Sequence, residues 1–136
     1  MPRETDLKLL LRAMRPTLCK DEYIFCSIDT QEPHYLNLNP IATFREAEGV
    51  SLIIEREVAD RAGIPYVAVF SMITLSVHSS LEAIGFLATI ATRLAEHGIS
   101  VNPVSAYYHD HLFVPVSRAE EAMDLLQKLS VGEGDR

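Results

Sequence analysis

Apolar residues at the start of the chain recur with helical spacing. Leucines and a methionine fall on one side of a helix between Thr5 and Pro16, which predicts an amphipathic helix capped by Thr5 and ended by Pro16. Residues 22–29 are rich in aromatic and β-branched side chains and predict a strand. Residues 30–40 contain two prolines and two asparagines, so we expect a loop there.

Two short segments, 42–48 and 50–54, follow on either side of Gly49. This pattern predicts a β-hairpin whose turn contains the glycine. Residues 55–62 predict a short helix, because Gly63 and a proline two residues later form a stop signal.

The longest apolar run, 66–77, is rich in β-branched residues and predicts a buried strand. The period then changes, and residues 81–97 predict a helix that Gly98 ends. Its expected buried stripe consists of Ile84, Leu87, Ala88, Ala91, Leu94 and Ala95.

A second hairpin is predicted from residues 99–108 and 111–116, with Leu112, Val114 and Val116 on its buried side. Ser117 and Glu120 have capping-box spacing and predict the start of a last helix. We expect that helix to bury Ala119, Ala122, Met123, Leu126 and Leu129.

The order of these elements suggests an internal repeat. The second half reads strand, helix, strand, strand, helix, and the first half contains a similar hairpin followed by a helix and a strand. We therefore expect two related α+β modules without a linker, at residues 1–65 and 66–130, and a frayed tail at 131–136.

Composition limits the classes of partner. The net charge of −7 argues against nucleic acid and anionic membranes, since both require a basic surface. The apolar stretch near the N-terminus is broken by Lys8 and Arg12, so we expect neither a signal peptide nor a membrane span, and a cytoplasmic protein. Cys19 and Cys26 lack the CxxC spacing; Cys26 is expected to be a reduced core residue, with a disulfide or thiol chemistry as the alternative.

Residues 74–88, TLSVHSSLEAIGFLA, resemble the strand, loop and helix of an ACT domain. Gly85 and Gly98 stand at the separation usual in that family, and the element order fits. Many ACT domains carry Asp-x-Pro-Gly before the helix, where this chain has Glu-Ala-Ile-Gly at 82–85. The stretches HSSLEAIG and YYHDHLFVPV are similar to those of stand-alone bacterial proteins with two ACT-like modules, related to aspartokinase regulatory domains, and the resemblance covers about residues 5–129.

The resemblance implies an α+β fold of two tandem ACT-like modules. Each would be a ferredoxin-like βαββαβ unit, with an antiparallel sheet covered by helices on one face. It also implies a homodimer that binds a small molecule, an amino acid in many relatives, and regulates another protein without catalysis or a cofactor. The alternatives from other classes are a metal-dependent enzyme and a ligand-free assembly module.

The segment between the long strand and its helix is the first candidate site. Backbone N–H groups at a helix N-terminus attract carboxylates, Glu82 could hold a ligand ammonium group, and Gly85 would permit close approach. Alternatively, Ser79 and Glu82 form a capping box that only completes the helix. Ser80 as a nucleophile lacks a G-x-S-x-G context. The expected contacts are His78, Ser79, Ser80, Leu81, Glu82, Ile84 and Gly85.

Two further contacts are candidates. Asn102 corresponds by the resemblance to an asparagine that helps to bind the amino acid in aspartokinase-like ACT domains, or it simply ends a strand before Pro103. Gly49 and Val50 lie at the first hairpin turn, which by the resemblance would face the second module's site, or they form a hairpin turn alone.

The stretch His109-Asp110-His111 offers a metal-site alternative. Two histidines two residues apart share a face of a strand, and His78 is the nearest candidate for a third ligand. If His109 and Asp110 form a two-residue turn, that geometry is lost and the stretch is a polar hairpin tip. We expect the hairpin tip and no bound metal.

Overall fold

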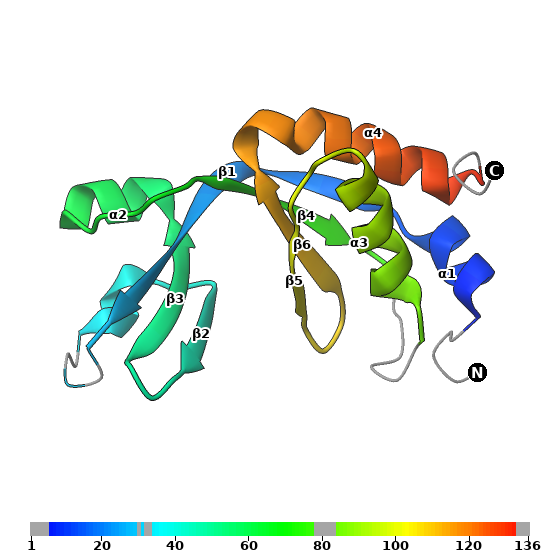
Figure 1. Cartoon of the computed structure of the whole chain (residues 1–136). Coiled ribbons are helices and arrows are strands. Elements are labelled where there is room, and N and C mark those ends of the chain that lie inside the picture. The colour runs from blue at the N-terminus through cyan, green and yellow to red at the C-terminus, as the bar shows by residue number, and fades with distance from the viewer. Residues whose placement is uncertain (1–5, 30, 32–33, 78–83, 133–136) are drawn as a thin grey trace. The chain divides into compact units, whose positions relative to one another are not determined.

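The computed structural model describes residues 6–29, 31, 34–77 and 84–132. Figure 1 shows the helices and strands along the chain. In order, they are α1 (Leu7–Ala13), β1 (Pro16–Ile28), β2 (Ala42–Arg45), β3 (Val50–Glu55), α2 (Arg56–Ala62), β4 (Phe70–Leu75), α3 (Phe86–Glu96), β5 (Asn102–Ser105), β6 (Asp110–Pro115) and α4 (Ala119–Ser130), with 3₁₀ turns at Tyr35–Leu38 and Val116–Arg118.

The chain divides into two compact units that interleave along the sequence. The central unit comprises residues 20–70, and the terminal unit comprises residues 1–19 and 71–136. β1 begins in the terminal unit and continues into the central unit. The division into sequential modules at 1–65 and 66–130 stays a prediction.

The central unit is a three-stranded antiparallel sheet with α2. Its strand order is β2-β3-β1, with Ile24 opposite Ile54 and Ala42 opposite Ile53. Alternate residues of β1 and β3 point toward a core that Ala59 of α2 completes. That core consists of Ile24, Val50, Leu52, Ile54 and Ala59.

The terminal unit combines the end of the sheet with α1, α3 and α4. β4, β6 and β5 are neighbours in that order, and Asn102 of β5 lies opposite Phe113 of the antiparallel β6. All three helices pack on one core. The largest fully buried side chains in it are Leu10, Met14, Ile73, Leu75, Ile90, Leu94, Ile99, Leu112 and Leu126.

The predicted α+β fold is confirmed. The predicted turn of the first hairpin and the predicted end of α2 are confirmed as well. The first hairpin turns at Gly49, and α2 ends at Gly63, whose φ of 70° is left-handed and which donates its N–H to carbonyls in the last turn. No helix in the described ranges has the length and hydropathy to cross a membrane.

Helix and strand ends required correction near the N-terminus. The cap of α1 is Asp6, which accepts a hydrogen bond from the N–H of Leu9 at 3.2 Å; the predicted cap, Thr5, lies outside the described residues. β1 begins at Pro16, six residues before the predicted start at 22. The additional residues include polar ones, which are extended because they belong to the sheet, and the local sequence pattern does not predict this.

The predicted long strand at 66–77 was too long, since β4 covers only 70–75. Tyr66 instead donates its hydroxyl to Asp60 at 2.8 Å, and Val67 is fully exposed. The apolar residues before β4 therefore form a connection beside α2. In the second hairpin the first strand is shorter than predicted, at 102–105, and the second, at 110–115, keeps its predicted length but begins one residue earlier.

α3 begins at Phe86, not near residue 81, and its buried face differs from the predicted stripe. Phe86, Ile90 and Leu94 are buried, whereas Ile84 is 86% exposed. The alanines of the predicted stripe carry too little apolar surface to decide which face is buried. Because the N-cap is Gly85, a Ser79–Glu82 capping box does not start this helix.

α4 begins at Ala119 after a 3₁₀ turn, so Ser117 is not its N-cap. No side-chain cap bond is present at this helix start. The buried face agrees with the prediction apart from Leu125, which is buried where Met123 was expected; Met123 is only partly buried.

Candidate functional site

The segment leading into α3 is only partly described. His78, Ser79, Ser80, Leu81 and Glu82, all predicted ligand contacts, lie outside the described residues. On the near side β4 ends at Leu75, and Val77 is buried in the terminal core. On the far side stand the two predicted contacts Ile84, which is exposed, and Gly85.

Gly85 sets the geometry of the α3 N-terminus. Its φ of 87° is left-handed, and its carbonyl accepts the first helical hydrogen bond from Thr89 N–H at 2.9 Å. No described side chain caps this end, and the first turn holds no acidic residue. The N–H groups of that turn therefore keep a partial positive charge.

A surface depression of about 300 Å³ adjoins Gly85 along the outer side of α3. Small side chains, Ala88 and Thr89, line it near the glycine, and Arg93 and Glu96 form an ion pair of 3.5 Å at its far end. A ligand here would meet helix backbone near Gly85 and a charged pair at the other end.

The other predicted contacts are described. Asn102 is the first residue of β5 and is exposed. Gly49 closes a turn in which Glu46 N–H donates to Gly49 O at 2.9 Å. A side chain at Gly49 would place its Cβ 2.8 Å from the carbonyl oxygen of Ile28, so packing alone explains the glycine. Val50 is buried in the central core.

The turn beside the histidine stretch is not the two-residue turn of His109 and Asp110. The turn is Ala106 to His109, closed by an Ala106 N–H bond to His109 O of 3.0 Å, and Asp110 is a buried strand residue. The His109 and His111 rings lie 6.4 Å apart at 88°. The described residues contain no group of three metal-binding side chains, and the predicted third ligand, His78, lies outside them.

The His111 ring makes a hydrogen bond with a side chain of the neighbouring strand β4. Its Nδ1 is 2.9 Å from the Thr74 hydroxyl oxygen of β4. Burial lowers the pKa of His111, the nearby His109 lowers it further, and Asp110 partly opposes them. These effects together favour the neutral form of the imidazole.

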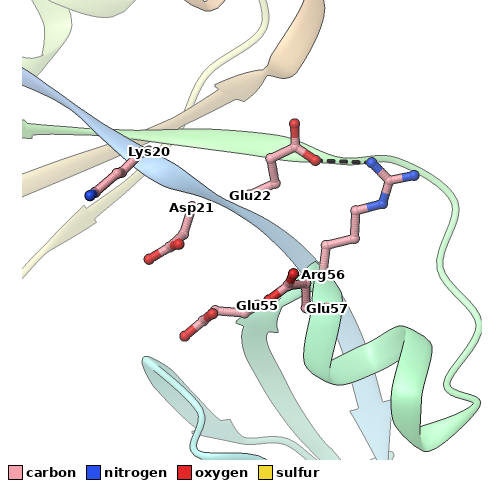
Figure 2. Close-up of a pocket in the computed structure, with 6 residues that line it drawn as sticks. All are labelled: Lys20, Asp21, Glu22, Glu55, Arg56 and Glu57. Carbon is pink, nitrogen blue, oxygen red and sulfur yellow. Dashed lines mark hydrogen bonds and ion pairs between the residues drawn. The ribbon is translucent and has the colours of Figure 1, made fainter.

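A charged pocket in the central unit was missed by sequence reasoning. It has a volume of about 230 Å³ and is lined by Lys20, Asp21, Glu22, Glu55, Arg56 and Glu57. Figure 2 shows Glu22 and Arg56 pointing toward one another across the gap between β1 and α2. These residues are 34 positions apart, so only the pairing of β1 with β3 brings them together.

Arg56 is the organising residue of this pocket. It donates to Glu22 at 2.9 Å and to the Tyr66 hydroxyl at 3.1 Å. Those hydrogen bonds raise the pKa of Arg56 above its usual range, so it is a permanent cation. The lining has four carboxylates and two cations, so it favours cationic ligands and repels anionic ones.

The family assignment rests on both halves of the sequence. Residues 2–71 match the ACT domain family, and residues 67–128 match it again. The chain belongs to the ACT domain family. Its two ACT domains are in tandem, which confirms the resemblance. Among curated proteins, none matches the chain.

Solved structures extend the comparison. A Vibrio cholerae protein of unknown function, described as a possible transport protein, is 49% identical, with a TM-score of 0.83 over 91% of this chain and 95% of that one. An Agrobacterium tumefaciens protein is 18% identical, with a TM-score of 0.68 over 96% and 91% of the two chains.

The regulatory subunit of aspartate kinase from Thermus flavus has the same fold. It is 10% identical, with a TM-score of 0.61 over 86% of this chain and 98% of that one. At this identity the likeness concerns the fold alone. The two ACT domains support a ligand-binding regulatory role.

Proposed function

We propose that this ACT protein is a cytoplasmic, homodimeric sensor that binds an amino acid and regulates a partner protein without catalysing a reaction. The observation that carries the proposal is the tandem pair of ACT domains, which together match residues 2–128 of the chain.

The ligand site proposed here is the N-terminus of α3 with the loop before it. Gly85 is left-handed, no described side chain caps the helix, and the first turn lacks acidic residues. An α-carboxylate is the group that such a helix end favours, because it can accept several N–H bonds and complement the helix dipole. Glu82 is the proposed partner of the α-ammonium group, and Asn102 is a proposed additional contact.

Regulation follows from the position of α3 in its unit. Phe86, Ile90 and Leu94 pack in the same core as Leu126 and Leu129 of α4 and Leu10 of α1. A ligand that orders the α3 N-terminus would change the relative stability of arrangements in which these helices pack differently. The partner protein would distinguish those arrangements.

Ligand binding to the native state can be tested by thermal unfolding. The purified protein would be screened against the twenty amino acids, with and without divalent metals, because a ligand of the native state raises the midpoint by mass action. A shift produced by one amino acid or one chemical group of them supports the proposal. A requirement for metal with turnover of a substrate would support the metal-dependent enzyme instead.

Asn102→Ala provides the site-specific arm of this test. Asn102 is exposed at the start of β5, so its truncation is expected to leave the fold intact. The ligand-induced shift should fall in Asn102→Ala and persist in His97→Ala, an exposed change at the opposite end of α3. Equal shifts in the two variants would place the ligand elsewhere.

A further inference from the structure

His109 and His111 remain outside the proposed amino-acid site and form a two-ligand arrangement at the tip of the β5–β6 hairpin. His111 lies on β6 opposite Val104, and His109 ends the turn before the strand. Their ring centroids are 6.4 Å apart. Figure 1 places this tip at the end of β6 that is far from α4.

The contact between Thr74 and His111 resembles the support of a metal ligand. A ligating histidine generally uses its second ring nitrogen to donate to a neighbouring oxygen, which fixes the ring and its tautomer. The Thr74 hydroxyl oxygen is 2.9 Å from Nδ1 of His111. With Nδ1 as the donor, Nε2 carries the lone pair and is the nitrogen left to bind a metal.

The spacing of the rings is close to that of a chelate. Two imidazoles bound to one tetrahedral zinc at about 2 Å have centroids about 5 Å apart. The observed 6.4 Å is larger than that value, so zinc binding would require the His109 side chain to rotate toward His111. In the proposed site this rotation brings the two histidines to two positions of one metal ion.

One chain does not complete the site within the part of it that the structure describes. Zinc takes four ligands, and no third metal-binding side chain joins this pair among the described residues. A two-fold axis through the metal would bring in the same two histidines from a second copy and give four imidazole nitrogens. The adjacent Tyr107 and Tyr108 are 64% and 65% exposed and would supply aromatic contact area between the copies.

We propose that His109 and His111 are half of a zinc site that two copies of the chain complete. This proposal is independent of amino-acid binding, because it uses neither Gly85 nor Asn102. It assigns the hairpin tip to metal-dependent assembly of a regulatory protein, with zinc as the linking ion.

The test is zinc binding by the tag-free full chain after removal of metal with a chelator. Calorimetric titration should give one zinc per two chains, and sedimentation should show that zinc increases the mass of the particle over that of the metal-free protein, whether that protein is a monomer or already the proposed homodimer. His109→Gln and His111→Gln should each abolish both effects, whereas His97→Gln, an exposed histidine at the end of α3, should retain them.

Thr74→Val tests the supporting contact separately. Loss of the group that orients a metal ligand typically weakens binding by about 10–100-fold, and the ratio of one zinc per two chains should stay the same. If His111→Gln fails to fold by circular dichroism, His109→Gln in the turn carries the test. One zinc per single chain, no zinc binding, or binding unaffected by the His109 and His111 changes would overturn the proposal.

Discussion

Arg118 donates a hydrogen bond from Nη2 to the backbone carbonyl of His97 at 2.7 Å, and so joins the start of α4 to the end of α3. A second bond of 3.3 Å reaches the Gly98 carbonyl, and Glu121 holds the guanidinium at 2.9 Å. A cation at the carbonyl end of a helix also complements the helix dipole. This single side chain therefore fixes the end of the helix whose other end is the proposed ligand site.

Removing this contact should cost measurable stability. We expect Arg118→Met to lower the free energy of unfolding by about 1–2 kcal/mol, the usual value for charge-assisted hydrogen bonds to partly exposed backbone groups. Urea titration of both proteins measures it. Arg61→Met, an exposed arginine in the last turn of α2, is the matched control and should change stability by less than about 0.5 kcal/mol. Equal losses in the two variants would contradict the role given to Arg118.

Gly49 should be the glycine least tolerant of substitution. Its added Cβ would lie 2.8 Å from the Ile28 carbonyl oxygen and 3.0 Å from Ser27 Oγ. We expect Gly49→Ala to cost about 2–4 kcal/mol, through displacement of β1 from the hairpin. In Gly98→Ala the left-handed φ of 72° is strained but nothing lies within 4 Å, so the cost should be about 1 kcal/mol. A smaller loss at Gly49 than at Gly98 would show that the turn is more adaptable than its contacts indicate.

Ile84 and Ile90 separate ligand contact from packing on α3. Ile90 is fully buried, and Ile90→Ala should lower stability by about 2–5 kcal/mol. Ile84 is 86% exposed, so Ile84→Ala should change the unfolding midpoint by little while it weakens ligand binding. Thermal unfolding without and with ligand measures both effects. A large loss of stability in Ile84→Ala would mean that this side chain packs in the core.

Cys26 should react slowly with alkylating agents. Burial raises the pKa of its thiol above the usual 9.0, so less thiolate is present at pH 8 in the folded protein than in the unfolded one. In the Cys19→Ser variant Cys26 is the remaining thiol. At pH 8 iodoacetamide should react with Cys26 in this folded variant more slowly than it reacts with the thiol of glutathione. The rate should increase in urea. A rate equal to that of glutathione in the native protein would contradict the desolvation of Cys26.

Local signals predicted much of the fold. The hairpin turn at Gly49 and the end of α2 at Gly63 were found because a glycine is needed there for reasons of backbone geometry or close contact. The extension of β1 to Pro16 was missed, because its polar residues become a strand only by joining a sheet. The buried face of α3 was mispredicted because alanines obscured the helical stripe, and the large residues Phe86 and Ile90 decide which face is buried.

The candidate sites could also be predicted only where their residues lie close together in the sequence. Sequence reasoning pointed to Gly85 and to the two histidines, since each belongs to a short recognisable pattern. It did not find the charged pocket around Arg56, whose residues look like ordinary surface charges in two separate segments. Thr74 was equally invisible as a partner of His111, because the two residues are 37 positions apart.

We propose above all that this ACT protein binds an amino acid at the N-terminus of α3. The most direct measurement is the unfolding midpoint of the wild-type protein and Asn102→Ala in the presence of each of the twenty amino acids. At a ligand concentration of about 100 times Kd, we expect a rise of about 8 °C for the cognate amino acid in the wild-type protein and a clearly smaller one in the variant. No shift by any amino acid at millimolar concentration, or a shift that Asn102→Ala leaves unchanged, would contradict it.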